Sequence, residues 1–517
     1  MTVLKPGHNA MARAAGTLAA PILLLSSGTA AAHMSGVVYN LPIPFWMYGF
    51  AASAALALSF LIVGYFVTAQ SVARNFRVIE FVVPDHKILR TALAGLRIAS
   101  VCALLLTILT GFFGPANPFA NFSVTFFWVI FALGFTYLTA LVGDVYALIN
   151  PWRVICDWLA RFKPRPLRPR AHYPRWLGFY PAFAFYLAFI WLELFGQPLP
   201  RTLGEILLAY SVINVVGAAV FGRDAWFHHG ELFAVFLRLI GKIAPFGYRI
   251  DPASGRPDRV QVRQPFMGLL AEPADHFSLL LFVIFMLSST AFDGVHETRP
   301  WALIFWQQIY PLLTRLIERP YLFFVSIYYF WQWTMLFASP FVYLAVYTLF
   351  VWLMKIVTGS TRSVRDLALQ FAFTLIPIAF VYNITHYYTL LLAEEPAIVT
   401  MISDPFAVGW NLFGTARIYR PPVILLADQV WHTQVGLILF GHIVSVYLAH
   451  LQALKLFPKG RQGVWSQLPM LALMMLLTTV GLRILSLPIA AGQVQDALPS
   501  SRNVPVTPAG DLADRFR

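Results

Sequence analysis

The sequence contains a series of apolar runs, each about 20 residues long, separated by short polar segments. About 20 apolar residues are what an α-helix needs to cross the ~30 Å hydrocarbon core of a bilayer. Hydrophobic residues make up 59% of the chain and charged residues only 12%, against about 25% charged residues in a typical soluble domain. The sequence therefore predicts an all-α fold, a polytopic transmembrane helical bundle in a lipid bilayer.

We expect about ten membrane-spanning helices in one transmembrane domain that covers residues 33–490. The run 321–356 is too long for one straight span, and Pro340 could kink or divide it. The interrupted apolar stretch 301–318 predicts an interfacial helix. The expected spans lie near 45–69, 91–113, 122–149, 176–196, 202–221, 276–292, 324–354, 368–392, 428–453 and 467–488.

Residues 1–32 have the pattern of a cleavable secretory signal peptide. Lys5 and Arg13 precede the short apolar stretch "AAGTLAAPILLLSS", and "TAAA" supplies small residues for cleavage. Cleavage after Ala32 makes His33 the first residue of the mature chain, whereas the alternative is an uncleaved first helix. At the other end, the polar tail 491–517 is expected to be poorly ordered.

The basic residues predict the orientation of the bundle. With His33 outside, the segments between spans that face inward carry 24 Lys and Arg, and those that face outward carry 9. This excess follows the positive-inside rule and agrees with export of the N-terminus. The net charge of +14 is therefore an orientation signal, and we expect no binding to nucleic acid because no aromatic-interleaved basic platform is present.

Four histidines fall on the predicted outer side, and three of them have an Asp or Asn three or four residues away. These spacings put both side chains on one helical face. Imidazole and carboxylate together suit Zn, Cu, Fe or Co, so we predict a divalent transition metal as cofactor. The predicted metal ligands are His33, Asp293, His296, His386, Asp428 and His432.

As a mature first residue, His33 would offer an α-amine with a pKa of about 7.7–8.0 and an imidazole to one ion. This arrangement resembles the histidine brace of copper monooxygenases. A copper-binding oxidase, monooxygenase or copper-handling protein is therefore an alternative function.

The stretch "FGRDAWFHHGELFAVFLRLIGKIAPF" (221–246) carries two alternatives. Its apolar residues favour an amphipathic helix lying on the inner leaflet. Asp224, His228 and Glu231 fall at helical spacing, which leaves a second metal site as the other interpretation.

A family resemblance adds to this reading. The segments "AAAH…LPIPFW", "NPWRVICDWL", "YPRWLGFYPA" and the stretch 221–246 resemble bacterial membrane proteins named fenitrothion hydrolase, from His33 to the last helix. The resemblance implies a multi-pass protein of the bacterial inner membrane that cleaves the P–O–aryl bond of organophosphorus triesters. The products would be a nitrophenol and a dialkyl thiophosphate, and no catalytic residue carries over from the family.

Apolar phosphotriesters partition into bilayers, and we expect a metal-activated water to be the nucleophile in their hydrolysis. The sequence holds no GxSxG nucleophile elbow and no P-loop. An aromatic wall for the leaving group would comprise Tyr382, Tyr387, Tyr388 and Trp431, with ordinary packing as the alternative. A transporter remains a further alternative, with a pathway along His442, Arg97, Glu193 and Arg483.

Overall fold

The computed structural model describes residues 44–67, 78–161, 169–251, 255–418, 421–457 and 465–487. The predicted signal peptide, His33 and the predicted tail 491–517 lie outside these residues. Their roles therefore stay predictions.

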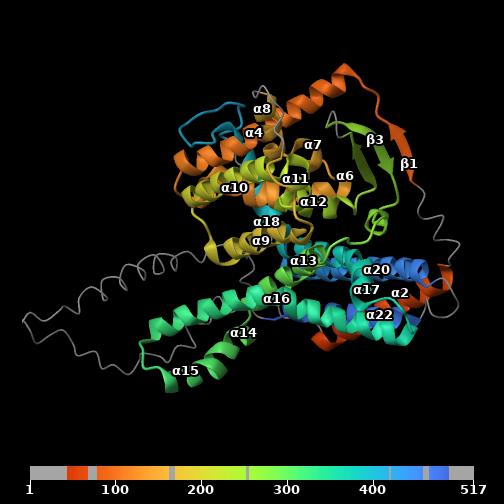
Figure 1. Ribbon diagram of the computed structural model, residues 1–517. Coiled ribbons are helices and arrows are strands. Elements are labelled where there is room, and N and C mark those ends of the chain that lie inside the picture. The colour runs from red at the N-terminus through yellow and green to blue at the C-terminus, as the bar shows by residue number, and fades with distance from the viewer. Residues whose placement is uncertain are drawn as a thin grey trace, which may run out of the picture.

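Ten helical segments of the described chain are long and apolar enough to cross a membrane, which confirms the predicted multi-pass helical fold. They form one bundle (Figure 1). In chain order they are α2 (Phe45–Phe66), α4 (Lys87–Phe113), α5–η2–α6 (Phe122–Val142), η3–α9–η4 (Arg175–Gly196), α10 (Pro200–Phe221), α13 (Phe277–His296), α16 (Tyr321–Thr358), α17 to α19 (Val364–Ser403), α20 (Ala427–Leu456) and α22 (Gln467–Leu485).

The long run after residue 320 forms one helix. α16 contains 38 residues and continues through Pro340, so the proline does not divide it. At 1.5 Å per residue it is about 57 Å long, which exceeds the ~30 Å hydrocarbon core. The first turns of α16 pack against the segment that precedes it in the chain, where the ring of Trp306 stacks on that of Tyr321. That segment, predicted as interfacial, consists of α14 (Arg299–Leu303), η6 (Ile304–Ile309) and α15 (Tyr310–Leu316), at one end of the bundle (Figure 1).

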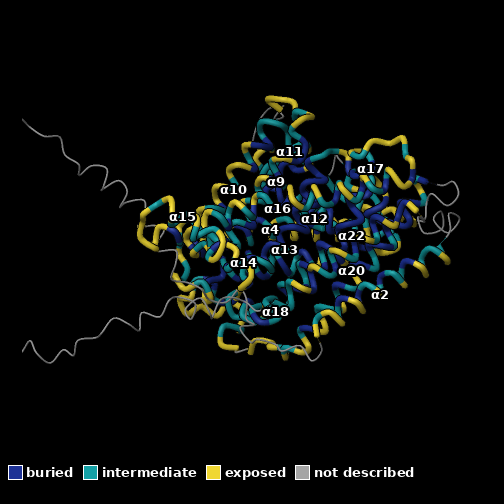
Figure 2. Tube along the Cα trace, turned by 90° about the horizontal axis from the view of Figure 1, so that it is seen from below, coloured by how far each residue is buried: buried dark blue, intermediate teal, exposed yellow. Residues whose placement is uncertain are grey.

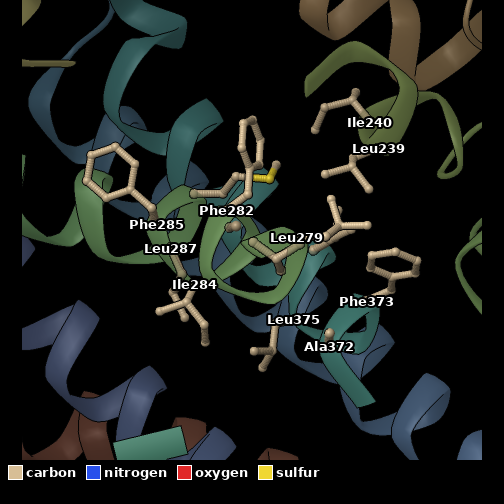
Figure 3. Close-up of a cluster of buried hydrophobic side chains, with 14 of the residues drawn as sticks. Leu239, Ile240, Leu279, Phe282, Ile284, Phe285, Leu287, Ala372, Phe373 and Leu375 are labelled. Carbon is tan, nitrogen blue, oxygen red and sulfur yellow. The ribbon is translucent and has the colours of Figure 1, made fainter. Parts of the chain in front are cut away.

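α13 is the central helix of the bundle. In its most apolar window 83% of residues are buried, against 22% in α2, α4 and α16. The buried residues gather in the middle of the molecule, and exposed residues cover its outside (Figure 2). Around α13, leucine and phenylalanine side chains pack against α12 (Leu232–Gly241) and η7 (Ala372–Leu375) (Figure 3). Polar residues on α13 are therefore enclosed by protein.

The stretch predicted to lie on the inner leaflet is instead buried in the bundle. α11 (Arg223–His229) follows directly after α10 but turns back along it, since Trp226 donates a hydrogen bond of 2.8 Å to Asn214. Glu231 then accepts a hydrogen bond of 2.6 Å from Tyr210, 11 residues and about 16 Å before the end of α10. The segment 223–241 is therefore a helical hairpin inserted between the spans. The prediction of a surface helix was wrong because α12 is apolar on nearly every side, and seven of its ten residues are buried.

The Glu231 carboxylate sits at the tip of this hairpin. It accepts hydrogen bonds from the amides of Phe233 and Ala234, which caps the N-terminus of α12. Asn150 and Tyr210 donate to the same carboxylate. Asp224 pairs with Arg153 instead, so Glu231 and Asp224 have separate structural partners.

A small antiparallel sheet, which the all-α prediction did not include, joins two segments between spans. β1 (Ile79–Val82) pairs with β3 (Pro257–Val262), and β3 pairs with β2 (Phe246–Ile250). The ammonium group of Lys455 also donates a hydrogen bond of 2.9 Å to the carbonyl of Leu270. The segments around residues 80, 260 and 455 therefore share one face of the bundle, as their basic composition predicted.

Candidate functional site

The last turns of α13 carry a buried carboxylate and a buried histidine. The side chains of Asp293 and His296 are 2% and 8% exposed, and their spacing of three residues puts them on one helical face. His296 Nδ1 lies 2.7 Å from the carbonyl oxygen of Asp293. Nδ1 must therefore carry a proton and donate it to this bond, which leaves Nε2 as the acceptor nitrogen of neutral imidazole.

α18 (Ile376–Glu394) brings two further predicted residues to Asp293. The Tyr387 hydroxyl donates a hydrogen bond of 2.7 Å to Asp293 Oδ2. His386 Nδ1 lies 3.8 Å from the same oxygen. The structure thus places one carboxylate between the two imidazoles and a phenol, all enclosed by protein.

A glycine permits this close approach of α13 and α18. A Cβ at Gly294 would lie 3.0 Å from Cε1 of His386 and 2.8 Å from a methyl group of Ile484 in α22. Such separations are tighter than normal packing permits, so any side chain here would force the side chains of His386 and Ile484 to shift. The requirement for glycine beside Asp293 is thus steric.

Asp293 faces a cavity of about 70 Å³ that is lined by the spans Phe122–Val142 and Arg175–Gly196 and by α12, α13 and α18. Asn383 also lines it, and its buried Oδ1 has no hydrogen-bond partner among the described residues. A buried carbonyl oxygen of this kind is ordinarily satisfied by a donor such as water. The polar residues that line the cavity are Thr136, Tyr186, Glu193, Ser289, Thr290, Asp293, Asn383 and Tyr387.

The cavity can hold several water molecules but no aromatic ring. An engineered apolar cavity that accepts benzene measures about 150 Å³, twice the volume found here. Its remaining lining is aromatic and aliphatic, including Trp128, Phe189 and Phe233. An aryl ester could thus present only a small end of its structure to Asp293 while the bundle keeps this conformation.

Glu193 is a cavity residue that the predicted metal site did not include. It lies in η4 (Leu192–Gly196), a π-helical turn at the end of α9 (Tyr180–Trp191). Its carboxylate interacts with the Tyr387 hydroxyl, which also binds Asp293. The sequence signal was present, because Glu193 is the only acidic residue in the apolar run 176–196 and acids at membrane depth are functional candidates.

The predicted pair on α20 lies elsewhere. Asp428 and His432 are exposed, and His432 Nδ1 lies 2.7 Å from the backbone carbonyl of Asp428. Neither residue lines the cavity around Asp293. Helical spacing correctly put the two on one face, but that face points away from the buried cluster.

Of the predicted aromatic wall, only Tyr387 lines the cavity. The Tyr382 hydroxyl donates a hydrogen bond of 2.9 Å to the carbonyl of Leu477. Trp431 is buried against Tyr48, with 5.2 Å between ring centroids. These contacts are helix packing, which was the alternative interpretation for both residues.

The residues proposed for a transport pathway are also spread over the molecule. Glu193 lines the cavity around Asp293, whereas Arg97 lines a second cavity to which Glu193 does not contribute. His442 is fully buried beside Tyr382, and Arg483 lies over the ring of Phe45. Each of the two cavities is thus lined by only one of these four residues.

The metal site was tested on the donor set itself. Within the described ranges, no group of three or more His, Cys, Asp or Glu is placed so that it could hold a metal ion. Asp293 has two imidazoles nearby, and because Nδ1 of His296 is engaged by a backbone carbonyl, this residue could bind a metal only through Nε2. A complete metal site would need a ligand from outside these ranges, and His33 lies there.

No family model, curated protein or solved structure matches this chain. What the sequence and the fold establish together is a multi-pass helical membrane protein.

Proposed function

We propose that this membrane protein is a hydrolase of apolar phosphoric triesters, and that the cavity around Asp293 is its working site. The observation that carries the proposal is the buried carboxylate of Asp293 at a cavity large enough for water. Ionisable groups enclosed at membrane depth are costly and mark functional sites. The substrate class comes from the resemblance of the sequence to fenitrothion hydrolases.

Asp293 would act as the general base of this reaction. It accepts a proton from a water molecule in the cavity, and the water oxygen forms the new bond to phosphorus. The P–O–aryl bond breaks, and the nitrophenolate leaves as an anion, so the leaving group needs no proton. A positioned base of this kind contributes about 10²–10⁴ in rate.

The neighbours of Asp293 would position its carboxylate. Tyr387 donates to Oδ2, which fixes the plane of the carboxylate. His296 and His386 do not line the cavity, and their Nδ1 atoms lie 3.9 Å and 3.8 Å from the carboxylate oxygens. The aryl group of the ester is larger than the cavity, so it would stay outside while phosphorus approaches the water.

A divalent metal would supply a Lewis acid and a more acidic water. The described residues do not form a site for it, so no step above uses one. Metal binding remains a proposal that depends on His33. Elemental analysis together with N-terminal sequencing tests it: a bound metal in a chain that begins at His33 supports it, and metal-free active protein refutes it.

We also propose that the basic face of the bundle is cytoplasmic and that the protein resides in a bacterial inner membrane. The sheet brings the Lys- and Arg-rich segments around residues 80 and 260 together, and the hydrogen bond of Lys455 adds the segment around residue 455 to the same face. The positive-inside rule places such segments in the cytoplasm. His296 and His386 then lie toward the periplasmic half.

The hydrolase is tested by nitrophenolate release from a nitrophenyl phosphotriester added to purified protein in detergent. We expect turnover in the wild type and at least a tenfold lower rate in His386→Ala, because Asp293 loses a positioning neighbour. His432→Ala is the matched control, since this histidine is exposed on α20, and its rate should stay at the wild-type level. No turnover by the wild type, or equal rates in both variants, would refute the proposal.

A second candidate function is proton or cation transfer across the membrane. Glu193 and Asp293 both interact with the hydroxyl of Tyr387, which makes a chain of exchangeable groups inside the bundle. Such chains serve as proton relays in transporters. In proteoliposomes that contain a pH-sensitive dye, the pH of the lumen should then fall. The variant Glu193→Gln should abolish this fall in pH. Glu205→Gln, on the exposed face of α10, is the control, and flux that survives Glu193→Gln contradicts the candidate.

A further inference from the structure

A second cavity, of about 180 Å³, lies toward the basic face of the bundle. It is enclosed by α4, by α8 (Pro151–Arg161) with the residues just before it, and by the start of α11. Its charged lining residues are Arg97, Arg153, Asp157, Arg161 and Arg223. Four guanidinium groups thus share one polar cavity with a single carboxylate.

The acidic residues nearby do not balance this charge. Asp157 accepts a hydrogen bond of 2.5 Å from Arg223. Asp224, whose side chain is 66% exposed and does not line the cavity, accepts one of 2.7 Å from Arg153. These two carboxylates leave an excess of two positive charges among the four arginines.

The other two arginines have no carboxylate within 4 Å among the residues that the structure describes. Arg97 is held by backbone carbonyls instead, at 2.9 Å from Leu148 and 2.5 Å from Gly255. A carbonyl fixes the guanidinium in place without neutralising it. Arg161 stands at the exposed end of α8, where a bound group can reach it.

Arg153 is the arginine of this set with a like charge beside it. Burial is the main cause that lowers the pKa of its guanidinium; Asp224 raises this pKa, and the neighbouring Arg223 cation lowers it further. Arginine stays charged in proteins, so like charges held this close call for an anion between them. Guanidinium forks match the oxygens of a phosphate group.

We propose that this cavity binds a phosphate group, carried by the headgroup of an anionic lipid or by free phosphate. Basic pockets between transmembrane helices at the cytoplasmic side are suited to lipid headgroups. The cavity has more than twice the volume of the first one, and its lining is polar. The proposal is independent of the hydrolase, because none of its residues lines the cavity around Asp293.

Native mass spectrometry of the detergent-purified full chain tests this proposal with three probes: phosphatidylglycerol, phosphatidylcholine and inorganic phosphate. We expect phosphatidylglycerol or phosphate to bind and phosphatidylcholine to bind at least tenfold more weakly. Binding of phosphatidylglycerol that inorganic phosphate does not displace identifies a lipid headgroup. Binding of inorganic phosphate alone identifies the free ion. Equal binding of both lipids, without phosphate binding, overturns the proposal.

Two variants locate the site. Arg97→Gln and Arg161→Gln should each weaken binding about tenfold, the loss expected for one charge-assisted hydrogen bond. Arg161→Gln removes no hydrogen bond within the described protein, so it remains informative if Arg97→Gln fails to fold. Arg201→Gln is the matched control, because Arg201 is exposed and pairs with Glu205 on α10. Binding that is unchanged in Arg161→Gln and folded Arg97→Gln would contradict the assignment.

Discussion

The hydroxyl of Tyr387 donates a 2.7 Å hydrogen bond to Oδ2 of Asp293, and both side chains are buried. This contact joins α18 to α13, the most enclosed span of the bundle. A hydrogen bond to a buried carboxylate contributes more than a neutral one, because the charge has few other donors. The hydrogen bond therefore stabilises the packing of α13 against α18 and also holds the Asp293 carboxylate in place.

Removing this donor should destabilise the protein. We expect Tyr387→Phe to lower the free energy of unfolding by about 2 kcal/mol, since Asp293 loses a hydrogen bond in a buried site. Tyr388→Phe is the matched control, because its hydroxyl is half-buried and lies 3.4 Å from the carbonyl of Val430. Thermal unfolding in detergent should show a clearly lower midpoint for Tyr387→Phe alone, and equal midpoints would contradict this role.

A methyl group at residue 294 should disturb the same site by a steric route. Gly294→Ala places a Cβ within 3.0 Å of both His386 and Ile484, and overpacking of this kind costs about 1–3 kcal/mol. Gly436→Ala on α20 is the control, because its Cβ would meet nothing within 4 Å. Alanine is the better helix former, so the control should hold or raise the unfolding midpoint. A stable Gly294→Ala protein with full activity would show that the close approach is not needed.

The reactivity of Cys156 should depend steeply on pH. Burial raises the pKa of its thiol to about 11, and the Asp157 carboxylate acts in the same direction. The thiolate is the reactive form, so at pH 8 only about 0.1% of this thiol is reactive, compared with roughly a quarter for an ordinary cysteine. In a Cys102→Ala background, alkylation should accelerate about tenfold per pH unit between 8 and 10. A rate at pH 8 like that of a free thiol would contradict this environment.

The bundle was predictable from sequence because apolar length alone determines which segments can cross a bilayer. All ten expected spans have a counterpart, including α16. The hairpin 223–241 was misassigned because α12 is only ten residues long, and a short apolar helix fits a membrane surface or a protein interior equally well. The small sheet was not predicted because β1 pairs with a strand about 180 residues away in the chain, and because β2 and β3 are only five and six residues long.

The site could be predicted only in part. Spacing correctly put Asp293 and His296 on one face of α13, whereas the contact of His386 with Asp293 is seen only in the structure. Spacing gives the residues that share a face but not the neighbour that the face meets, so Asp428 and His432 were grouped with residues that they do not join. Glu193 enters the cavity through a π-helical turn, and this shift in register has no signature in the spacing of residues.

The role of Asp293 as the general base is tested by the initial rates of nitrophenolate release in Asp293→Asn and Asp428→Asn. Both variants replace an aspartate by its isosteric amide, but only Asp293 lines the cavity. We expect a rate at least about a hundredfold below wild type for Asp293→Asn and a wild-type rate for Asp428→Asn, with both proteins folded by circular dichroism. A folded Asp293→Asn protein with wild-type turnover would contradict this role.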